Sequence, residues 1–291
     1  MPDHRESSSA RRAWLRAACV ALACAALSGL ARAGAAQAAS AEGIVLRLHP
    51  RVGDTLRTRL EQVTEIASAQ AGGGPARPMT TRVTVLARTI VQASRQATTT
   101  VFTIVDSAEV HSSDAHGAAM SAQAEKALRA QRMIVELAED GSVEHARDAR
   151  GVAVPRDVAN AMAAMPAVLP RRPIAVGERW QREMPIPSAG PIGSGNAQVR
   201  AEFRLDSLSG NGEVAFVSMR GQIASDAGAR GVDMSGSMSG AMQIDRVRGW
   251  MTDSFFTLLI RSVVTPPNGV GMQPMKFVTK VTQRLRTMDK R

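Results

Sequence analysis

The residues best suited to bind a metal ion lie in one short run, which begins at His111, passes through Asp114 and ends at His116. Two imidazoles and a carboxylate form a ligand set that zinc accepts. The two histidines are five positions apart, so on a strand they would project from opposite faces. On a helix, neighbouring side chains are about three or four residues apart. We therefore interpret this run as a polar loop and predict no metal site.

Acid–base catalysis requires two carboxylates in a cleft, and the most crowded carboxylates are Glu136, Glu139 and Asp140. Because Asp140 precedes a glycine in a typical turn pair, we expect Glu139 and Asp140 to be exposed. Residues 236–240 have the glycine spacing of a hydrolase nucleophile turn, but Met238 stands in place of the serine. No phosphate-binding or dinucleotide-binding glycine motif follows a predicted strand. We predict no catalytic residue, no enzyme activity and no cofactor, with a hydrolase of unrecognised site as an alternative.

Residues 1–38 have the parts of a secretory signal peptide. The paired Arg11 and Arg12 belong to a positive start, residues 17–30 form an Ala-rich apolar stretch, and Ala38 ends a small-x-small cleavage site. This stretch is shorter than the roughly 20 apolar residues of a membrane-spanning helix. We predict cleavage after Ala38 and export to the periplasm or the medium by the Sec route. The paired arginines make the twin-arginine route an alternative.

The composition excludes further classes of function. Both cysteines, Cys19 and Cys24, fall in the predicted leader, so after cleavage no disulfide or thiolate site remains. The position three before Cys24 is Ala21 instead of the Leu of a typical lipoprotein signal, which disfavours lipid attachment. The net charge is +10, but aromatic residues make up only 3% of the chain, and binders of single-stranded nucleic acid stack bases on aromatic rings. We predict no nucleic-acid partner and no membrane-spanning segment.

Alternation of apolar and polar residues dominates the rest of the chain, as in half-buried antiparallel strands. Val199, Ala201, Phe203 and Leu205 share one face, and the turn at residues 209–212 leads into a second strand of a hairpin. Other predicted strands lie at residues 44–48, 56–66, 81–91, 100–105, 132–137, 213–219, 239–245, 250–264 and 275–288.

Two helices interrupt these strands, at residues 118–130 and 155–165, and the second begins and ends beside prolines. We expect loops at residues 67–78, 185–196 and 226–237. The fold class is thus α+β, mainly antiparallel β: a curved sheet or half-barrel with one or two covering helices.

The last predicted strand has a basic face. Lys276, Lys280, Arg284 and Arg286 occupy even positions, opposite apolar residues. Such a face could attract anionic headgroups or an acidic partner. The alternative that we favour is a solvated outer face whose charges blunt an edge strand.

A short pattern occurs twice: Val52-Gly53-Asp54 returns as Val176-Gly177-Glu178. Glycine followed by an acid forms a good turn, and each copy leads into a predicted strand. Either the chain contains two similar halves, or a common turn recurs by chance. We divide the chain into a signal peptide (1–38), a β-rich N-terminal half (39–150), a helix with a Pro-rich connector (151–172) and a β-rich C-terminal half (173–291).

The second copy belongs to a longer run, Leu169-Pro170-x-x-Pro173-x-x-Val176-Gly177-Glu178-x-Trp180. This run resembles the Pro-x-x-Val-Gly-Asp/Glu-x-Trp motif of an uncharacterised family of exported bacterial proteins. The resemblance implies a secreted, mostly antiparallel β protein and brings no activity or ligand with it. We predict structural roles for Gly53, Asp54, Gly177, Glu178 and Trp180, and we expect Trp180 to be buried.

Taken together, these patterns predict a non-enzymatic exported protein of the cell envelope. We expect it to hold a hydrophobic small molecule, a lipid or a protein partner in its curved sheet. A structural or assembly factor without a small ligand is the alternative. The 15 methionines fit either view, because Met fills irregular cores and also lines adaptable apolar grooves. An apolar concavity would favour the binding protein, and a filled sheet would favour the structural factor.

Overall fold

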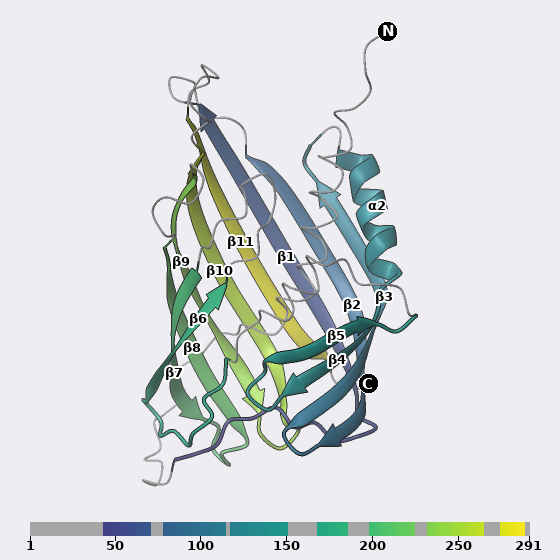
Figure 1. Ribbon diagram of the computed structural model, residues 1–291, viewed down its shortest axis with the longest axis vertical. Coiled ribbons are helices and arrows are strands. Elements are labelled where there is room, and N and C mark those ends of the chain that lie inside the picture. Colours follow the sequence, from purple (N-terminus) through teal and green to yellow (C-terminus); the bar gives the residue numbers. More distant parts are fainter. Residues whose placement is uncertain are drawn as a thin grey trace.

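The computed structural model describes residues 43–70, 78–114, 117–150, 168–185, 198–224, 232–264 and 274–288. Within them the chain forms one helix and an eleven-stranded antiparallel sheet that curves around a concave face (Figure 1). The predicted fold class, mainly antiparallel β with a curved sheet and few helices, is confirmed. The predicted helix at residues 155–165 lies outside the described residues.

The elements in chain order are β1 (Thr55–Gln70), β2 (Met79–Arg95), β3 (Thr98–Ser112), α2 (Gly117–Arg129), β4 (Arg132–Ala138), β5 (Val143–Asp148), β6 (Arg179–Pro185), β7 (Gln198–Leu208), β8 (Val214–Ala224), β9 (Val232–Asp245), β10 (Trp250–Val264) and β11 (Met275–Met288). The helix predicted at residues 118–130 is confirmed as α2. In the described part of the chain, no helix has the length and apolar character needed to cross a membrane.

The strands follow the order β5-β4-β3-β2-β1-β11-β10-β9-β8-β7-β6 across the sheet. The first and last strands therefore pair at its centre, and β5 and β6 form its two edges. All ten pairings are antiparallel, so β5 and β6 run in the same direction. If β5 and β6 paired with each other, they would form a parallel pair, unlike the ten antiparallel pairs of the sheet. They do not pair, and the sheet remains open.

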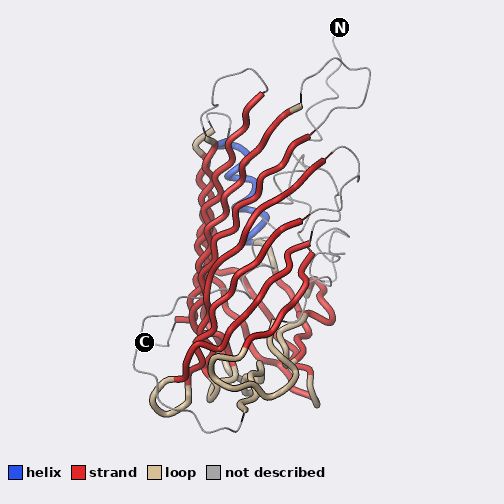
Figure 2. The backbone as a smooth tube through the Cα atoms, turned by 90° about the vertical axis from the view of Figure 1, so that its left-hand side faces the viewer, coloured by secondary structure: helices blue, strands red, loops and turns tan. Residues whose placement is uncertain are grey.

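The two ends of the sheet are built differently. At the end where β1 begins, which we call the turn end, short hairpin turns gather together (Figure 2). Gly141, Gly212 and Gly249 lie in these turns with φ values of 89°, 70° and 61°, a conformation that glycine adopts without steric cost. The turns at Gly141 and Gly212 lie at positions predicted from the sequence. We call the opposite end the far end.

Two segments outside the sheet pack against its concave face near the turn end: residues 43–50 and 168–174. The backbones of Ile44 and Ile174 bond to each other, with N···O distances of 2.7 and 2.9 Å. The amide of Leu48 donates to the carbonyl oxygen of Glu139 at 2.7 Å. The predicted strand at residues 44–48 is wrong, because its one bridge to Ile174 is isolated and the segment crosses the sheet instead of joining it.

The concave face carries the main hydrophobic core. Its most deeply buried large side chains lie toward the turn end, and five of them are at most 2% exposed: Phe203, Leu205, Met219, Met242 and Ile244. The segments that cross the concave face add Leu46, Leu169 and Ile174, each at most 1% exposed. The turn half of the concave face is therefore filled by the protein's own side chains.

The basic residues of the last predicted strand lie on β11, in the centre of the sheet. Lys280 pairs with Glu65 of β1 at 3.3 Å, and Arg284 and Arg286 approach Asp253 of β10 at 2.8 and 3.7 Å. The interpretation as a charged edge strand is therefore wrong. The sequence did not show that β11 pairs with β1 as well as with β10, because β1 lies more than 200 residues away along the chain.

The helix α2 covers the part of β3 that β4 does not reach. The β4 pairing ends at Ile104, so beyond it β3 has a neighbouring strand, β2, on one side only. Glu125 accepts a hydrogen bond from the Val110 amide at 2.9 Å, and Arg129 donates to the Ala108 carbonyl oxygen at 2.8 Å. Two side chains of one helix thus satisfy a strand edge, which would otherwise be open to pairing with another chain.

Strand β9 begins inside the predicted loop at residues 226–237, so that prediction is wrong from Val232 onward. A Cβ atom at Gly236 or Gly240 would collide with the carbonyl oxygen of Leu259 or Phe255 on β10. Glycine in a strand often marks such a close backbone approach. The Ser- and Gly-rich composition therefore concealed a strand.

The two Val-Gly-acid runs form matching turns at the starts of β1 and β6. Gly53 and Gly177 have φ values of 89° and 88°. In each copy the glycine amide donates to the next strand, at the carbonyl oxygen of Val91 (2.9 Å) or Leu205 (2.7 Å). The amide of that same residue donates back to the carbonyl oxygen of the acid, at 2.9 and 3.1 Å. Both β-rich segments of the chain thus begin from one local structure.

Candidate functional site

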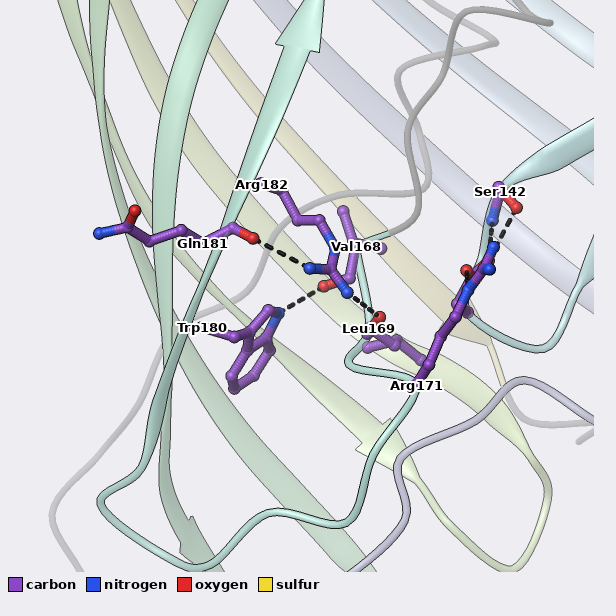
Figure 3. Close-up of polar contacts among 8 residues, drawn as sticks. Ser142, Val168, Leu169, Arg171, Trp180, Gln181 and Arg182 are labelled. Atoms are coloured by element: carbon purple, nitrogen blue, oxygen red, sulfur yellow. Dashed lines mark hydrogen bonds and ion pairs between the residues drawn. The ribbon is translucent and has the colours of Figure 1, made fainter.

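Residues 168–171, which we call the strap, run between the two open edges of the sheet (Figure 3). The amides of Val168 and Leu169 donate to the carbonyl oxygen of Asp140, in the turn between β4 and β5, at 3.1 and 3.0 Å. Their carbonyl oxygens accept from Trp180 (2.6 Å) and Arg182 (3.1 Å), both on β6. The strap therefore ties together two strand ends that share no pairing within the sheet.

Trp180 lies on β6, two residues after the Gly177-Glu178 turn, and is 6% exposed. Its indole ring stacks on Phe203 of β7, with ring centroids 5.5 Å apart and planes 13° apart. The indole N–H bonds to the strap (Figure 3). Its burial therefore serves both the core and the attachment of the strap.

The remaining residues with predicted structural roles are not brought together. Gly53 and Asp54 precede the central strand β1, whereas Gly177 and Glu178 precede the edge strand β6. The carboxylate of Glu178 accepts from the amide of Ala175 at 2.9 Å and pairs with Arg172. These two contacts hold the pKa of Glu178 below its ordinary value.

Asp140 is buried, at 5% exposure, contrary to the expectation of an exposed turn residue. The turn itself forms, but segments 43–50 and 168–174 pack over it. Burial alone would raise the pKa of Asp140, yet hydrogen bonds from Ser142 Oγ and Arg171 Nε, both at 2.7 Å, outweigh it and the pKa is lowered. The charged form of Asp140 therefore anchors the strap.

Toward the far end, the concave face changes character. On β6 to β8 the face stays buried, since Met184, Val199 and Ile223, in the same row as Ile260, are at most 6% exposed. On β1, β9, β10 and β11 the apolar residues toward the far end are only half-buried; we call them the far wall: Ile66, Met234, Leu258, Ile260, Val264, Met275, Phe277 and Val281. Leu258 and Ile260 extend directly from the main core. The far wall is thus an apolar surface that the fold does not fully bury.

Two cavities among the described residues contain charged groups in their lining, and the one at the turn end also includes Leu56, Val247 and Met288. One lies between β2 and β3, beside Arg82, Glu109 and His111, and the other lies at the turn end, beside Arg51 and Arg248. His111 is exposed on β3, and its sequence partner His116 lies outside the described residues. In the described ranges, no three His, Cys, Asp or Glu side chains gather as a metal site would require.

The sequence of residues 156–251 matches the model of a family of unknown function (DUF6263). The match covers about a third of the chain and includes the Val-Gly-Glu-x-Trp run. It agrees with the resemblance to an uncharacterised family that the sequence suggested. No curated protein matches the chain.

Among solved structures, the chain is similar to lipovitellin, described for its lipid–protein interactions, with a TM-score of 0.45 and 6% identity. The similarity covers 83% of this chain but only 26% of the lipovitellin chain. An outer membrane channel of Pseudomonas putida F1 gives a TM-score of 0.24 and 12% identity, over 83% of this chain and 97% of that one. DynF of Micromonospora chersina gives 0.23 and 10%, over 90% and 95%. Likeness at this level carries no function over to the chain.

Sequence reasoning missed the strap contacts and Arg182. The alternation around Trp180 was available as a signal, because Trp180, Arg182 and Met184 share one parity on a short strand. The sequence alone did not distinguish Arg182, at an inward position, from the many other arginines of the chain. Only the pairing of β6 with β7 shows which parity faces the core.

Proposed function

We propose that this chain is an exported cell-envelope protein that holds a hydrophobic small molecule or lipid against the concave face of its sheet, without catalysing a reaction. The far wall is the observation that carries the proposal. Its half-buried apolar side chains come from four neighbouring strands, β1, β9, β10 and β11, and share one face with the small polar residues Ser262 and Thr279. Contiguous exposed apolar surface in a folded protein commonly marks a binding site.

Burial of apolar surface supplies the free energy of such binding. Removing apolar surface from water contributes about 25 cal/mol per Å², so an apolar ligand that covers the far wall gains free energy. The turn half of the concave face is already filled and supplies a rigid support for such a site. Export follows from the predicted leader at residues 1–38 and would place the protein where lipids and other apolar molecules must cross an aqueous compartment.

A structural or assembly role is the second candidate. The filled turn half and the capped edge of β3 favour it, because both are features of stability rather than of binding. The two candidates differ in what they predict for the far wall: the structural role requires no ligand there.

Adjacent leucines on β10 offer a matched test. Leu258 faces the concave side, whereas Leu259 faces the convex side, and both are half-buried. We expect the chain starting at Ala39 to bind the neutral dye Nile red, and we expect Leu258→Gln to weaken that binding by about tenfold or more, because it places an unpaired amide in an apolar site. Leu259→Gln should leave the affinity unchanged.

Fluorescence titration measures both variants, and native mass spectrometry of the purified chain looks for a retained lipid. Absence of dye binding and of any co-purified apolar molecule would contradict the binding function. Equal loss in the two leucine variants would also contradict it, since the convex face would then matter as much as the concave one.

A further inference from the structure

Positive charge on the convex face of the sheet is concentrated on the three central strands, β2, β1 and β11. Their charged residues lie on the side opposite to core residues such as Leu60 and Leu285. This set has eight cations and two carboxylates, and we call it the ridge: Arg57, Arg59, Glu61, Glu65, Arg82, Arg88, Lys276, Lys280, Arg284 and Arg286. On the convex face of the edge strands β6 and β7, three arginines and three carboxylates balance: Arg179, Glu183, Arg200, Glu202, Arg204 and Asp206. The arginine-rich composition alone therefore does not explain the ridge.

Two pairs of arginines lie directly opposite each other on the ridge. The register places Arg57 of β1 opposite Arg88 of β2, and it places Arg59 of β1 opposite Arg286 of β11. Like charges at directly opposite positions destabilise a sheet. An anionic partner on this face would relieve the repulsion, because its charges would lie among the guanidinium groups.

The carboxylates near the ridge do not neutralise it. Four carboxylates pair with five of the eight cations: Arg59 with Glu61, Lys280 with Glu65, Arg88 with Asp106 of β3, and Arg284 and Arg286 with Asp253 of β10. The side chains of these five cations are between 35% and 54% exposed. Exposed ion pairs contribute little to stability, so these cations exchange a carboxylate for another anion at low cost. Even with Asp106 and Asp253 counted, cations outnumber carboxylates by four.

The shape of the sheet and two apolar side chains indicate which kind of anion fits the ridge. Strands β1 and β11 lie at the centre of an open, curved sheet, so they form the most prominent part of its convex face (Figure 1). A convex ridge meets a flat surface along its length and does not enclose a small anion. Val278 and Met288 lie on the same face of β11 as its cations and are 42% and 39% exposed. Apolar side chains among cations are typical of protein surfaces that lie on anionic membranes.

We propose that the ridge docks the protein onto a membrane surface that contains anionic phospholipids, with its arginines bound to lipid phosphate groups. The planar guanidinium donates two parallel hydrogen bonds to a phosphate, and cations near an anionic membrane surface are attracted to it. Docking through the ridge leaves the concave face and its far wall directed away from the membrane. The proposal goes beyond the binding function above and does not depend on it, because the ridge and the far wall lie on opposite faces of the sheet.

Flotation of the chain starting at Ala39 with lipid vesicles tests this proposal. Vesicles of phosphatidylcholine mixed with phosphatidylglycerol should bind the chain at low salt, whereas vesicles of phosphatidylcholine alone should not. Salt should release the chain, because the Debye length falls from about 10 Å at 0.1 M to about 3 Å at 1 M.

The double substitution of Arg59→Gln with Arg286→Gln removes one opposed pair from the ridge. A cation near an anionic surface strengthens binding about fivefold, so the loss of two should weaken vesicle binding about 25-fold. Thermal unfolding should show that the variant is folded, because the substitution also relieves a like-charge repulsion.

Two arginines of β7 provide the matched control. Arg200 and Arg204 also face the convex side, and their side chains are 74% and 48% exposed. Each lies near a carboxylate, Glu183 at 3.2 Å and Asp206 at 3.7 Å, as Arg59 and Arg286 do. Arg200→Gln with Arg204→Gln lowers the net charge by the same amount but leaves the ridge intact, so vesicle binding should remain nearly unchanged.

Three outcomes would overturn the proposal: no binding to the anionic vesicles, equal binding to both kinds of vesicle, or an equal loss in the ridge variant and the β7 variant. Retention on heparin without binding to anionic vesicles would assign the ridge to a soluble polyanion and would also overturn it. Leu258→Gln, in the far wall, should leave vesicle binding unchanged. Loss of Nile red binding with intact vesicle binding would therefore reject the function proposed above and keep the role of the ridge.

Discussion

The turn half and the far half of the concave face have similar strand patterns but different degrees of burial. In the turn half, Phe203, Leu205 and Val217 are 0% exposed. In the far half, Leu258 and Phe277 are equally apolar but only half-buried. The comparison teaches that alternation along a strand assigns a residue to a face, whereas the segments that cross that face determine how far it is buried.

The contacts of the crossing segments explain the difference. Residues 43–50 and the strap reach the turns at the turn end, where backbone groups such as the carbonyl oxygen of Asp140 receive them. These contacts concentrate hydrogen bonds and burial in one half of the sheet. We therefore expect substitutions in the turn half to lower the stability and substitutions in the far half to alter ligand binding.

The largest expected effect is that of Trp180→Ala. Truncation of a buried Trp costs about 3–5 kcal/mol, and here it also removes the hydrogen bond from the indole to the strap. Urea unfolding of the ligand-free chain should show this loss. Phe277→Ala in the far wall should cost less than half as much, because its side chain is only half-buried. An unchanged unfolding midpoint in Trp180→Ala, with ligand binding lost, would reverse our assignment of the two halves.

The next effect concerns the buried carboxylate that anchors the strap. Asp140→Asn should lower the free energy of unfolding at neutral pH by about 1–3 kcal/mol, because hydrogen bonds to a charged group are lost. The pKa of Asp140 is lowered in the folded chain, so its stabilisation is present above the unfolded pKa, about 3.9, and disappears as the pH falls through the folded value. Wild type and variant should therefore converge at acidic pH.

Glu139→Gln is the control for this test, because it removes a charge from the same turn. Glu139 pairs with Arg47 at 3.7 Å and is 36% exposed, and such surface pairs contribute about 0–1 kcal/mol. A loss as large as that of Asp140→Asn would show that net charge, rather than the anchored strap, stabilises the turn half.

The smallest effect is expected from substitutions of the glycines in the two matching turns. Neither Gly53 nor Gly177 has an atom within 4 Å of an added Cβ, so Ala at either site tests backbone strain alone. A left-handed conformation costs an L-residue about 1–2 kcal/mol, and chemical denaturation should show similar losses for Gly53→Ala and Gly177→Ala. A clearly larger loss at one site would show that the two turns support their halves unequally.

Much of the fold could be predicted from local patterns. The bounds predicted for the last two strands agree with β10 and β11, and the predicted first helix agrees with α2 to within one residue. The turns at Gly141 and Gly212 were also recognisable, because a conformation with positive φ favours glycine. These features depend on interactions between near neighbours in the chain.

By itself, therefore, the sequence determined the strand-rich class, the buried face of its most regular strands such as β7, and the chemistry of its turns. The tertiary structure decided that β11 pairs with β1, that residues 44–48 cross the sheet, that Asp140 is buried and that Arg182 faces the core. Each of these depends on contacts between residues far apart in the chain, where loop closure and competing partners, rather than local propensity, select the arrangement. The candidate site belongs to this second group, since the far wall comes from β1, β9, β10 and β11, which only the strand order of the sheet brings side by side.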